Sequence, residues 1–273
     1  MSSNCASVDG PGDPFDTSVP TPTMHIGPNA IRPAGPWTAT THALLRHLEN
    51  VGFTASPRVV GDGFDNEGRE VLTWIEGEIV QPRPFPDPQD SLYRIGQLMR
   101  ELHAATASFV PPPDATWMPW GLHRNGPGTI ISHGNIAPWH VVIRDGCPVG
   151  FIGWEYAGPV VRMEELAATG WYCCQLHDDD VAELAGLPDA ETRAQWLRAF
   201  LDGYELSKYE RVGLVTRMIE WAVRDTAAFA RQKDFKCVEG HANAQHLWLM
   251  SWQIRAADWM LNHRAMLQNV IEK

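Results

Sequence analysis

The residues of this chain that could do chemistry gather in one polar loop and just after the strand pair that follows it. The loop runs from His133 to His140 and contains Asn135, and Glu155 lies further along the chain. An imidazole titrates near neutral pH and can transfer protons, whereas the amide of Asn135 cannot accept one. A single histidine without a second ligand at a recognisable spacing seldom holds a metal, so we predict no metal here.

Two apolar runs behind the loop must position it. Residues 141–143 (Val-Val-Ile) and 149–152 (Val-Gly-Phe-Ile) flank a short connection that contains Asp145 and Gly146. An Asp-Gly pair supplies the positive φ angles that a tight turn between antiparallel strands needs. We therefore predict a β-hairpin that begins where the loop ends.

The loop resembles the catalytic loop of the aminoglycoside phosphotransferase family, a small-molecule branch of the kinase fold, where the pattern reads His-Gly-Asp, four residues, Asn. The segment Trp-Glu-Tyr-Ala-Gly-Pro at 154–159 is similar to the family's segment after the hairpin. The resemblance implies an Asp that accepts the substrate proton, an Asn that holds Mg²⁺ and a second Asp for the metals. Those positions hold Asn135, His140 and Gly153 here. The chain therefore resembles a divergent member that lacks the catalytic and metal-binding acids.

The resemblance implies an α+β fold: the two-lobed, protein-kinase-like fold of the aminoglycoside phosphotransferases, with a reduced N-lobe and a mainly helical C-lobe. Residues 1–23 are rich in Ser, Pro, Gly and Asp and are predicted to form a flexible tail. Residues 81–89 contain too much proline for a helix or a central strand. We expect the N-lobe at 24–80, a Pro-rich connection at 81–89, and the C-lobe, with the loop and a substrate cleft, at 90–273.

Hydrophobic spacing predicts the elements within these lobes. In the N-lobe we expect a helix capped by Thr38 or Thr40, strands at 51–60 and 70–75, and a turn between the strands at 61–63. In the C-lobe we expect a turn at Gly158-Pro159 and five helices, at 90–107 (capped by Asp90), 162–176, 189–205, 210–233 and 242–273.

Several residues allow two interpretations. Arg32 is either the one basic candidate for phosphate contact near the N-lobe strands or an ordinary surface residue. Residues 74–78 stand where the resemblance places the hinge between the lobes, although Gly77 could simply end a strand. The run from His177 to Asp180 looks like a chelating cluster, but acidic residues before an apolar segment are typical of a helix N-terminus. Five tryptophans belong either to the C-lobe core or to a pocket for a flat, apolar ligand: Trp196, Trp221, Trp248, Trp252 and Trp259.

Charge and composition narrow the partners. With 22 basic and 33 acidic residues the formal net charge is −11, which argues against nucleic acid and against an anionic membrane surface. Five cysteines without a CxxC pair fit a reducing compartment, and no apolar run is long enough to span a bilayer. We predict a cytoplasmic protein that binds a small molecule and neither nucleic acid nor membrane, and the sequence does not indicate an oligomeric state.

Four functions remain open. The first is a kinase-fold enzyme repurposed for non-phosphoryl chemistry on a small molecule, such as an acid/base rearrangement, a cyclisation or a dehydration in biosynthesis, without a cofactor. The second is a non-catalytic pseudokinase that binds a small molecule or a partner. The third is a residual ATP-dependent phosphotransferase, and the fourth is a protein without a ligand. We place the first slightly ahead, because exchanging three polar groups for a histidine in the cleft indicates a change of function.

One predicted site serves the first two functions. In the kinase fold the residues at positions 140 and 153 converge, so the resemblance implies that His140 and Gly153 face one another, with room for a ligand where the Asp is missing. His140 would be the acid or base. The residues predicted to act on the ligand are His140, Asn135 and Glu155, and those predicted to bind it are Trp139, Trp154, Tyr156 and His133.

Overall fold

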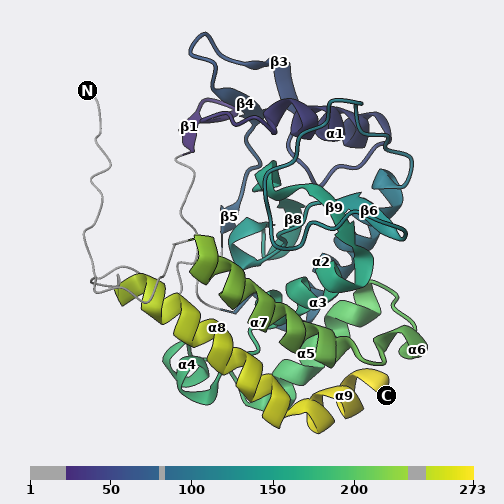
Figure 1. Ribbon diagram of the computed structural model, residues 1–273, viewed down its shortest axis with the longest axis vertical. Helices are drawn as coiled ribbons and strands as arrows, with labels where there is room; N and C mark the ends of the chain where they lie inside the picture. Colours follow the sequence, from purple (N-terminus) through teal and green to yellow (C-terminus); the bar gives the residue numbers. More distant parts are fainter. Residues whose placement is uncertain (1–22, 80–83, 233–243) are drawn as a thin grey trace.

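The computed structural model describes residues 23–79, 84–232 and 244–273. A small sheet with one helix forms the upper part of the molecule in Figure 1, and the long helices gather below it. This arrangement confirms the α+β architecture with a small first part and a mainly helical second part. The predicted tail at 1–23 lies almost wholly outside the described residues, and so does part of the predicted connection at 81–89.

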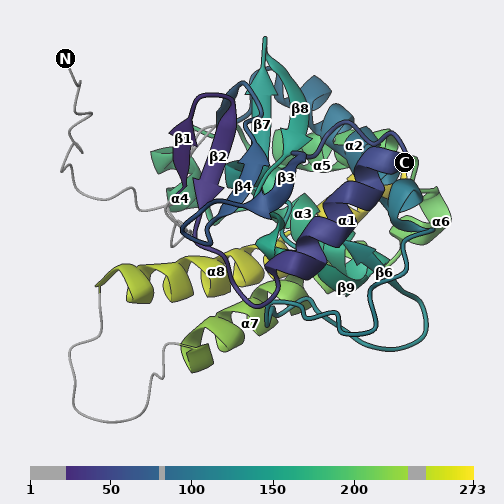
Figure 2. The same cartoon turned by 90° about the horizontal axis from the view of Figure 1, so that it is seen from above.

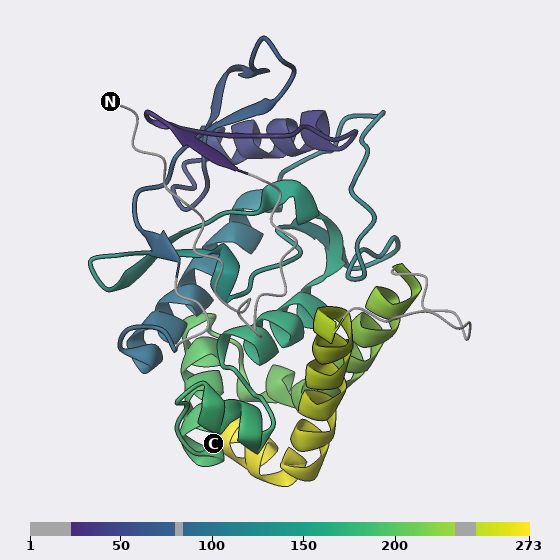
Figure 3. The same ribbon diagram turned by 90° about the vertical axis from the view of Figure 1, so that its left-hand side faces the viewer.

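The first sheet is antiparallel, with the strand order β1-β2-β4-β3. The pairing of β2 with β4 places Arg32 opposite Glu70, so that a cation and a carboxylate enter the interior side by side. Helix α1 lies along this sheet in Figure 3. The elements are β1 (Met24–Ile26), β2 (Asn29–Arg32), α1 (Thr38–Asn50), β3 (Val59–Phe64) and β4 (Glu70–Thr73).

The turn between β3 and β4 lies later than predicted. Residues 51–58 form no strand, and β3 runs through the predicted turn at 61–63 with an irregular register against β4. The chain reverses at 65–68, where Oδ1 of Asp65 accepts hydrogen bonds from the backbone N–H groups of Glu67 and Arg69, both at 2.9 Å. An aspartate that bonds its own following backbone stabilises a turn at that point in the chain.

Helix α1 begins at Thr38, but the predicted threonine cap is wrong. The residue at the N-cap position is Trp37, which makes no side-chain cap. Thr38 Oγ1 instead accepts a hydrogen bond from Gly35 N at 2.9 Å, and Thr40 Oγ1 accepts one from Thr116 N at 2.9 Å. Both hydroxyls therefore tie neighbouring loops to the helix.

The helical part is held together by close contact between α2 and α5. A Cβ built on Gly203 would lie 1.9 Å from the carbonyl oxygen of Tyr93, and one built on Gly96 would lie 2.1 Å from that of Phe200. Glycine at both positions is what allows the helices to approach so closely. The helices are α2 (Pro88–Thr106), α3 (Arg162–Cys173), α4 (Asp179–Leu184), α5 (Ala190–Gly203), α6 (Lys208–Arg211), α7 (Leu214–Gln232), α8 (Ala244–Asn262) and α9 (Arg264–Glu272).

Some helix boundaries differ from the prediction. Helix α2 starts before Asp90, with Asp87 at its N-cap position, and α3 ends three residues earlier than expected, at Cys173. The helix predicted at 210–233 is α6 and α7, separated at Gly213, whose φ of 78° is not helical. The helix predicted from 242 is broken at His263, between α8 and α9.

The predicted hairpin is confirmed, and it lies beside the first sheet in Figure 2. Strands β7 (Val141–Arg144) and β8 (Cys147–Phe151) are joined by Asp145 and Gly146, with φ of 52° and 78°. Strand β5 (Glu78–Ile79) adds to the edge of β7. The predicted turn at Gly158-Pro159 is wrong, because both residues lie in β9 (Gly158–Val161), which pairs with β6 (Thr129–Ser132).

None of the described helices is both long and apolar enough to cross a membrane. Cys147, Cys173 and Cys174 are free thiols, the last two buried.

Candidate functional site

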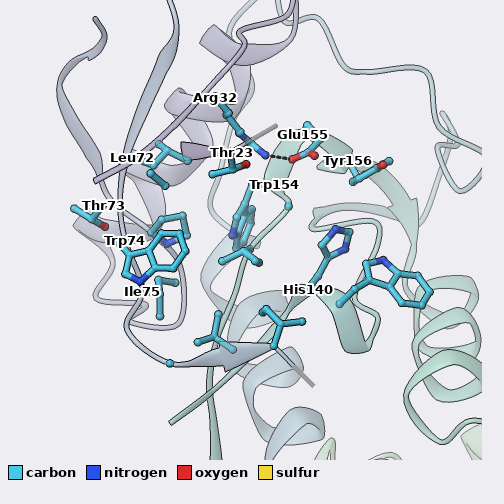
Figure 4. A pocket seen from close by; sticks show the side chains of 18 residues that line it. Thr23, Arg32, Leu72, Thr73, Trp74, Ile75, His140, Trp154, Glu155 and Tyr156 are labelled. Carbon is cyan, nitrogen blue, oxygen red and sulfur yellow. Dashed lines mark hydrogen bonds and ion pairs between the residues drawn. The ribbon is translucent and has the colours of Figure 1, made fainter. Parts of the chain in front are cut away.

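A cavity of about 350 Å³ opens between the first sheet and the hairpin. It is bounded on one side by β2, β4 and residues 74–79, and on the other by β7 and two short 3₁₀ turns, Pro138–His140 and Trp154–Tyr156. Figure 4 shows Arg32 and Glu155 joined at one end of the cavity, with Trp74, Trp154 and His140 along it. The lining residues used below are Arg32, Leu72, Trp74, Ile75, Ile79, Trp139, His140, Val142, Gly153, Trp154, Glu155 and Tyr156.

The walls of the cavity are largely apolar and aromatic. Trp154 is fully buried, and its Nε1 donates a hydrogen bond to the Phe151 carbonyl at 2.7 Å, which fixes the indole plane. Trp74 stacks on His25 with ring centroids 4.0 Å apart, and Trp139 meets Tyr172 edge to face at 5.3 Å. Rings held by such contacts offer flat apolar surface without losing much side-chain entropy when a ligand binds.

His140 presents one defined edge to the cavity. Its Nδ1 lies 2.7 Å from the carbonyl oxygen of Asn135, and because a carbonyl only accepts, Nδ1 must carry the proton. The neutral ring then has its lone pair on Nε2. Burial lowers the pKa of His140, and neither the charge of Glu155 nor the Asn135 carbonyl fully offsets that effect. The side chain is therefore a neutral hydrogen-bond acceptor near pH 7.

His140 and Gly153 do face one another, but the room expected between them is absent. A Cβ built on Gly153 would lie 2.4 Å from Cδ2 and 2.5 Å from Nε2 of His140. Gly153 also has a φ of 80°, which side-chain-bearing residues seldom adopt. The imidazole has taken the space of the missing side chain, so the cavity lies beside this pair and not within it.

Arg32 is buried between two carboxylates, so its interpretation as a surface residue is wrong. Its Nε donates to Glu70, and one of its terminal nitrogens donates to Glu155. Glu70 also lies 3.0 Å from Nε2 of His42. Burial opposes ionisation of Glu155, but the Arg32 guanidinium and smaller contributions from other groups together outweigh burial and hold the pKa of Glu155 below its ordinary value. One cation thus links β2 and β4 to the turn after the hairpin.

Two predicted site residues, Asn135 and His133, lie outside this cavity. His133 is fully buried, with Nε2 donating to the Ile152 carbonyl at 2.7 Å and Nδ1 accepting from Asn135 N at 3.2 Å. Burial lowers the pKa of His133 to about 4, so the ring stays neutral. Asn135 lines a narrow crevice beside Tyr172 and Trp221 instead. The structure therefore brings Trp139, His140, Trp154, Glu155 and Tyr156 together and leaves these two aside.

A buried acid holds the loop in place. Glu165 accepts hydrogen bonds from Gly134 N at 2.7 Å and from Nε2 of His103 at 2.9 Å, and the other nitrogen of His103 lies 2.8 Å from the Tyr204 hydroxyl. These groups satisfy one another in the core, so Glu165 and His103 have structural roles.

The acidic run at 177–180 is a helix N-terminus, not a chelating cluster. Asp178 is the N-cap of α4 and accepts a hydrogen bond from Asp179 N at 2.8 Å. Arg255 pairs with Asp178 and Asp180 at 2.7 and 2.5 Å. Within residues 23–79, 84–232 and 244–273, no group of three or more His, Cys, Asp or Glu side chains could hold a metal ion.

Sequence reasoning missed several cavity residues. Leu72 and Trp74 were assigned only to a strand and a hinge, and Ile79 and Val142 carried no signal beyond hydrophobicity. The available signal in the sequence was the Trp-Ile pair at 74–75, followed closely by Gly77. In the structure, a Cβ built on Gly77 would lie 2.4 Å from the carbonyl oxygen of Ile143, so glycine lets this segment approach the hairpin. Close packing of this segment on the hairpin is what turns its side chains toward the cavity. The C-lobe tryptophans 221, 252 and 259 are buried in the core, and none of them lines this cavity.

Two solved structures that are similar to this chain are a small-molecule kinase and a phosphotransferase. A microcompartment-associated aminopropanol kinase matches with a TM-score of 0.55 at 10% identity, covering 88% of this chain and 86% of that one. An aminoglycoside phosphotransferase from Alicyclobacillus acidocaldarius subsp. acidocaldarius DSM 446 matches with a TM-score of 0.54 at 14% identity, covering 92% of each chain. These likenesses confirm the aminoglycoside phosphotransferase type of kinase-like fold, and at such low identity they say nothing of activity.

The sequence itself is similar to a protein named for immunity. No protein-family model matches the chain. The trifolitoxin immunity protein of Rhizobium leguminosarum bv. trifolii is 45% identical over 239 residues, which cover 87% of this chain and 90% of that protein. At that identity and coverage, the chain belongs to the family of the trifolitoxin immunity protein.

Proposed function

We propose that this chain confers immunity to a toxin, either trifolitoxin or a compound related to it, by binding the toxin in the cavity between the sheet and the hairpin. The family supplies the biological role, since the relative is named as an immunity protein. The cavity supplies the means. Binding without turnover was the second of the functions left open by the sequence, and the geometry of the site favours it over the first.

The observation that carries this proposal is the character of the cavity. Its walls include the indole rings of Trp74 and Trp139, and its two charged lining residues, Arg32 and Glu155, are paired with each other. A volume of about 350 Å³ is in the range of small-molecule sites. Apolar and aromatic walls with few polar groups are typical of a binding pocket for a flat organic molecule.

Among the described residues that line the cavity, the groups that phosphoryl transfer needs are missing or already paired. A kinase site needs a carboxylate to accept the proton, oxygen ligands for Mg²⁺ and free cations for the phosphates. Asn135 is neutral and lies in another crevice, and Gly153 has no side chain. Arg32 is already bonded to Glu70 and Glu155. These contacts argue against the residual phosphotransferase.

Acid/base chemistry at His140 is a second candidate, supported by one observation. Its Nε2 carries the lone pair on the edge of the ring that borders the cavity, because Nδ1 is bound to the Asn135 carbonyl. A general base works best with a pKa near the operating pH, and burial lowers the pKa of His140. Asn135, its predicted helper, contributes only a backbone carbonyl. This incomplete constellation places catalysis behind binding.

The test is protection of a trifolitoxin-sensitive strain that expresses the chain, combined with calorimetry of the purified protein and trifolitoxin. We expect protection, saturable binding and toxin recovered with an unchanged mass. Trp74→Ala and Trp139→Ala should reduce protection and weaken binding at least tenfold. The matched control is Tyr209→Ala, which removes an exposed aromatic ring that does not line the cavity.

Other outcomes decide against binding alone. Toxin recovered with an altered mass would establish the second candidate, and a mass gain of one phosphoryl group that requires ATP would restore the phosphotransferase. If the wild-type chain gives no protection and does not bind trifolitoxin, the proposal is rejected.

A further inference from the structure

Arg32, His140 and Glu155 form the polar end of the cavity, which is called its floor below. Their chemistry indicates what kind of ligand the cavity accepts, a deduction that rests on the proposed binding function. Two of the residues that line the cavity carry side-chain acceptors from opposite sides of the hairpin, His140 at Nε2 and Glu155 at its carboxylate. His140 ends the loop before the hairpin and Glu155 lies in the turn after it. A ligand group placed at the base of the hairpin would therefore lie near both residues.

The imidazole acceptor is fixed by the backbone. The Asn135 carbonyl holds the proton on Nδ1, so the lone pair lies on Nε2, on the edge of the ring that packs against Gly153. His140 as a whole residue is 9% exposed, so its side chain is largely shielded from water. A buried acceptor left unbonded costs free energy, so a ligand that donates to Nε2 gains more than a hydrogen bond made in water would give.

The carboxylate acceptor is charged and only partly used. Oε2 of Glu155 accepts from Arg32, and the residue's own backbone N–H also interacts with the carboxylate, whose two oxygens keep lone pairs for a ligand. The side chain is 14% exposed, which leaves it reachable from the cavity while weakening the solvent screening of its charge.

Formal charge around this floor favours a cation. Arg32 contributes +1 and Glu70 and Glu155 contribute −1 each, so these three side chains sum to −1. Arg32 is the one Lys or Arg side chain among the described lining residues, and both of its carboxylate partners are in place. An anionic ligand would have to displace one of them, whereas a cation adds a partner to an existing excess of negative charge.

The aromatic walls favour the same class. The faces of indole rings attract ammonium and guanidinium groups, and this attraction is strongest where water is excluded. Trp74 and Trp139, which are both partly exposed, line the cavity together with Glu155. Rings beside a carboxylate recognise a molecule that joins a flat apolar part to a positively charged nitrogen.

We propose that the cavity selects organic cations: a planar or apolar body lies against the indoles, and a protonated nitrogen donates hydrogen bonds to Nε2 of His140 and to Oε1 of Glu155. A nucleotide, whose phosphates are anionic, is the wrong class for this floor. The part of the toxin that enters the cavity is, on this basis, an aromatic or apolar group that carries an amine, amidine or guanidine.

Three probes of nearly equal size test the charge preference on the wild-type protein: tryptamine (cation), indole-3-ethanol (neutral) and indole-3-acetate (anion). Dissociation constants come from calorimetry, or from saturation-transfer NMR if binding is weak. We expect tryptamine to bind at least tenfold more tightly than indole-3-acetate, with indole-3-ethanol between them. Equal affinities, a preference for the anion, or no binding of tryptamine would overturn the proposal.

Variants assign the preference to the named atoms. Glu155→Gln should remove most of the tryptamine preference while leaving indole-3-ethanol binding within about threefold. The matched control Glu205→Gln neutralises an exposed glutamate paired with Arg100 away from the cavity and should change nothing. If Glu155→Gln fails to fold, the wild-type comparison of the three probes still decides.

Failure here is distinguishable from failure of immunity. The probes report charge selection by the cavity whether or not the toxin binds, whereas the protection assay reports immunity whatever group of the toxin is recognised. A chain that protects cells but shows no preference for tryptamine would retain the immunity function and lose the organic-cation proposal.

Discussion

The imidazole of His140 occupies the space that a side chain on Gly153 would need. A Cβ at position 153 would lie 2.4 Å from Cδ2 of His140, a separation that real Cβ atoms essentially never show. The two departures from the phosphotransferase pattern at positions 140 and 153 are therefore linked by one steric contact. With the imidazole in this position, any side chain at 153 would force the ring to shift, so glycine at 153 and histidine at 140 suit one another sterically.

Gly153→Ala should destabilise the protein through this contact. We expect a loss of about 2–4 kcal/mol in the free energy of unfolding, because alanine meets both the buried ring and a φ of 80°. The matched control is Gly146→Ala, with a φ of 78° and nothing within 4 Å of its Cβ, which isolates the backbone cost at about 1 kcal/mol. Urea denaturation of both variants measures the difference.

A double-mutant cycle shows whether His140 is the cause. His140→Ala combined with Gly153→Ala should cost less than the sum of the single changes, with a coupling of about 1–3 kcal/mol. Additive effects would mean that the ring moves aside at no cost, which would contradict the steric link.

Arg32→Met should cost far more than the loss of a surface arginine. The change leaves Glu70 and Glu155 buried without their cation, and breaking a buried pair in this way costs about 3–5 kcal/mol. Arg100→Met, which breaks an exposed pair with Glu205, should cost no more than about 1 kcal/mol. Equal losses in chemical denaturation would show that Arg32 is not part of a buried network.

The pH dependence of the Arg32 variant has a defined sign. In the wild type, burial opposes ionisation, but His42 and Arg32 together lower the pKa of Glu70, and Arg32 lowers that of Glu155. Their contribution to stability is present above the unfolded pKa, near 4.5, and is lost as the pH falls through the folded values. Without Arg32, burial dominates and protonation relieves it, so the gap between Arg32→Met and wild type should narrow from pH 7 to pH 4.

Asp225 should make the protein less stable as the pH rises from 5 to 7. Burial raises its pKa from 3.8 to about 6, despite hydrogen bonds from Tyr172 and Gln253 at 2.7 Å each. The contribution of Asp225 to folding stability is complete below its pKa in the unfolded chain. It is lost as the pH rises through its pKa in the folded protein. Relative to Asp225→Asn, the wild type should lose about 1 kcal/mol between pH 5 and pH 7. Asp114→Asn, at an exposed position, should show no such trend in thermal melts.

Mg²⁺-ATP should bind weakly or not at all. Gly153 offers no oxygen ligand, the imidazole of His140 is a poor partner for Mg²⁺, and Arg32 is bonded to two carboxylates. Calorimetry with and without Mg²⁺ checks this. Micromolar affinity that depends on the metal would contradict it, and phosphorylation of a hydroxylated compound would revive the kinase interpretation.

Local sequence determined the elements whose signals are complete within a few residues. The Asp145-Gly146 pair specifies the hairpin because its positive φ angles match the twist of the flanking strands. Asp178 and Asp189 cap α4 and α5 through their own side chains, and the apolar spacing of three and four residues located the other long helices. The same local view misplaced the turn before β4, where Asp65 bonds to its own following backbone.

Only the tertiary structure decided the site. Arg32 pairs with Glu70 and Glu155, which lie 38 and 123 residues away, and no local pattern predicts which distant carboxylates will neutralise a cation. The resemblance placed His140 opposite Gly153, but whether the ring would fill that space or leave it open depended on packing from both sides. Trp74 became a cavity wall because its segment packs on the hairpin. The sequence named the groups that could do chemistry, whereas the folded chain determined which of them remain accessible, since burial and pairing are properties of residues brought together from distant positions.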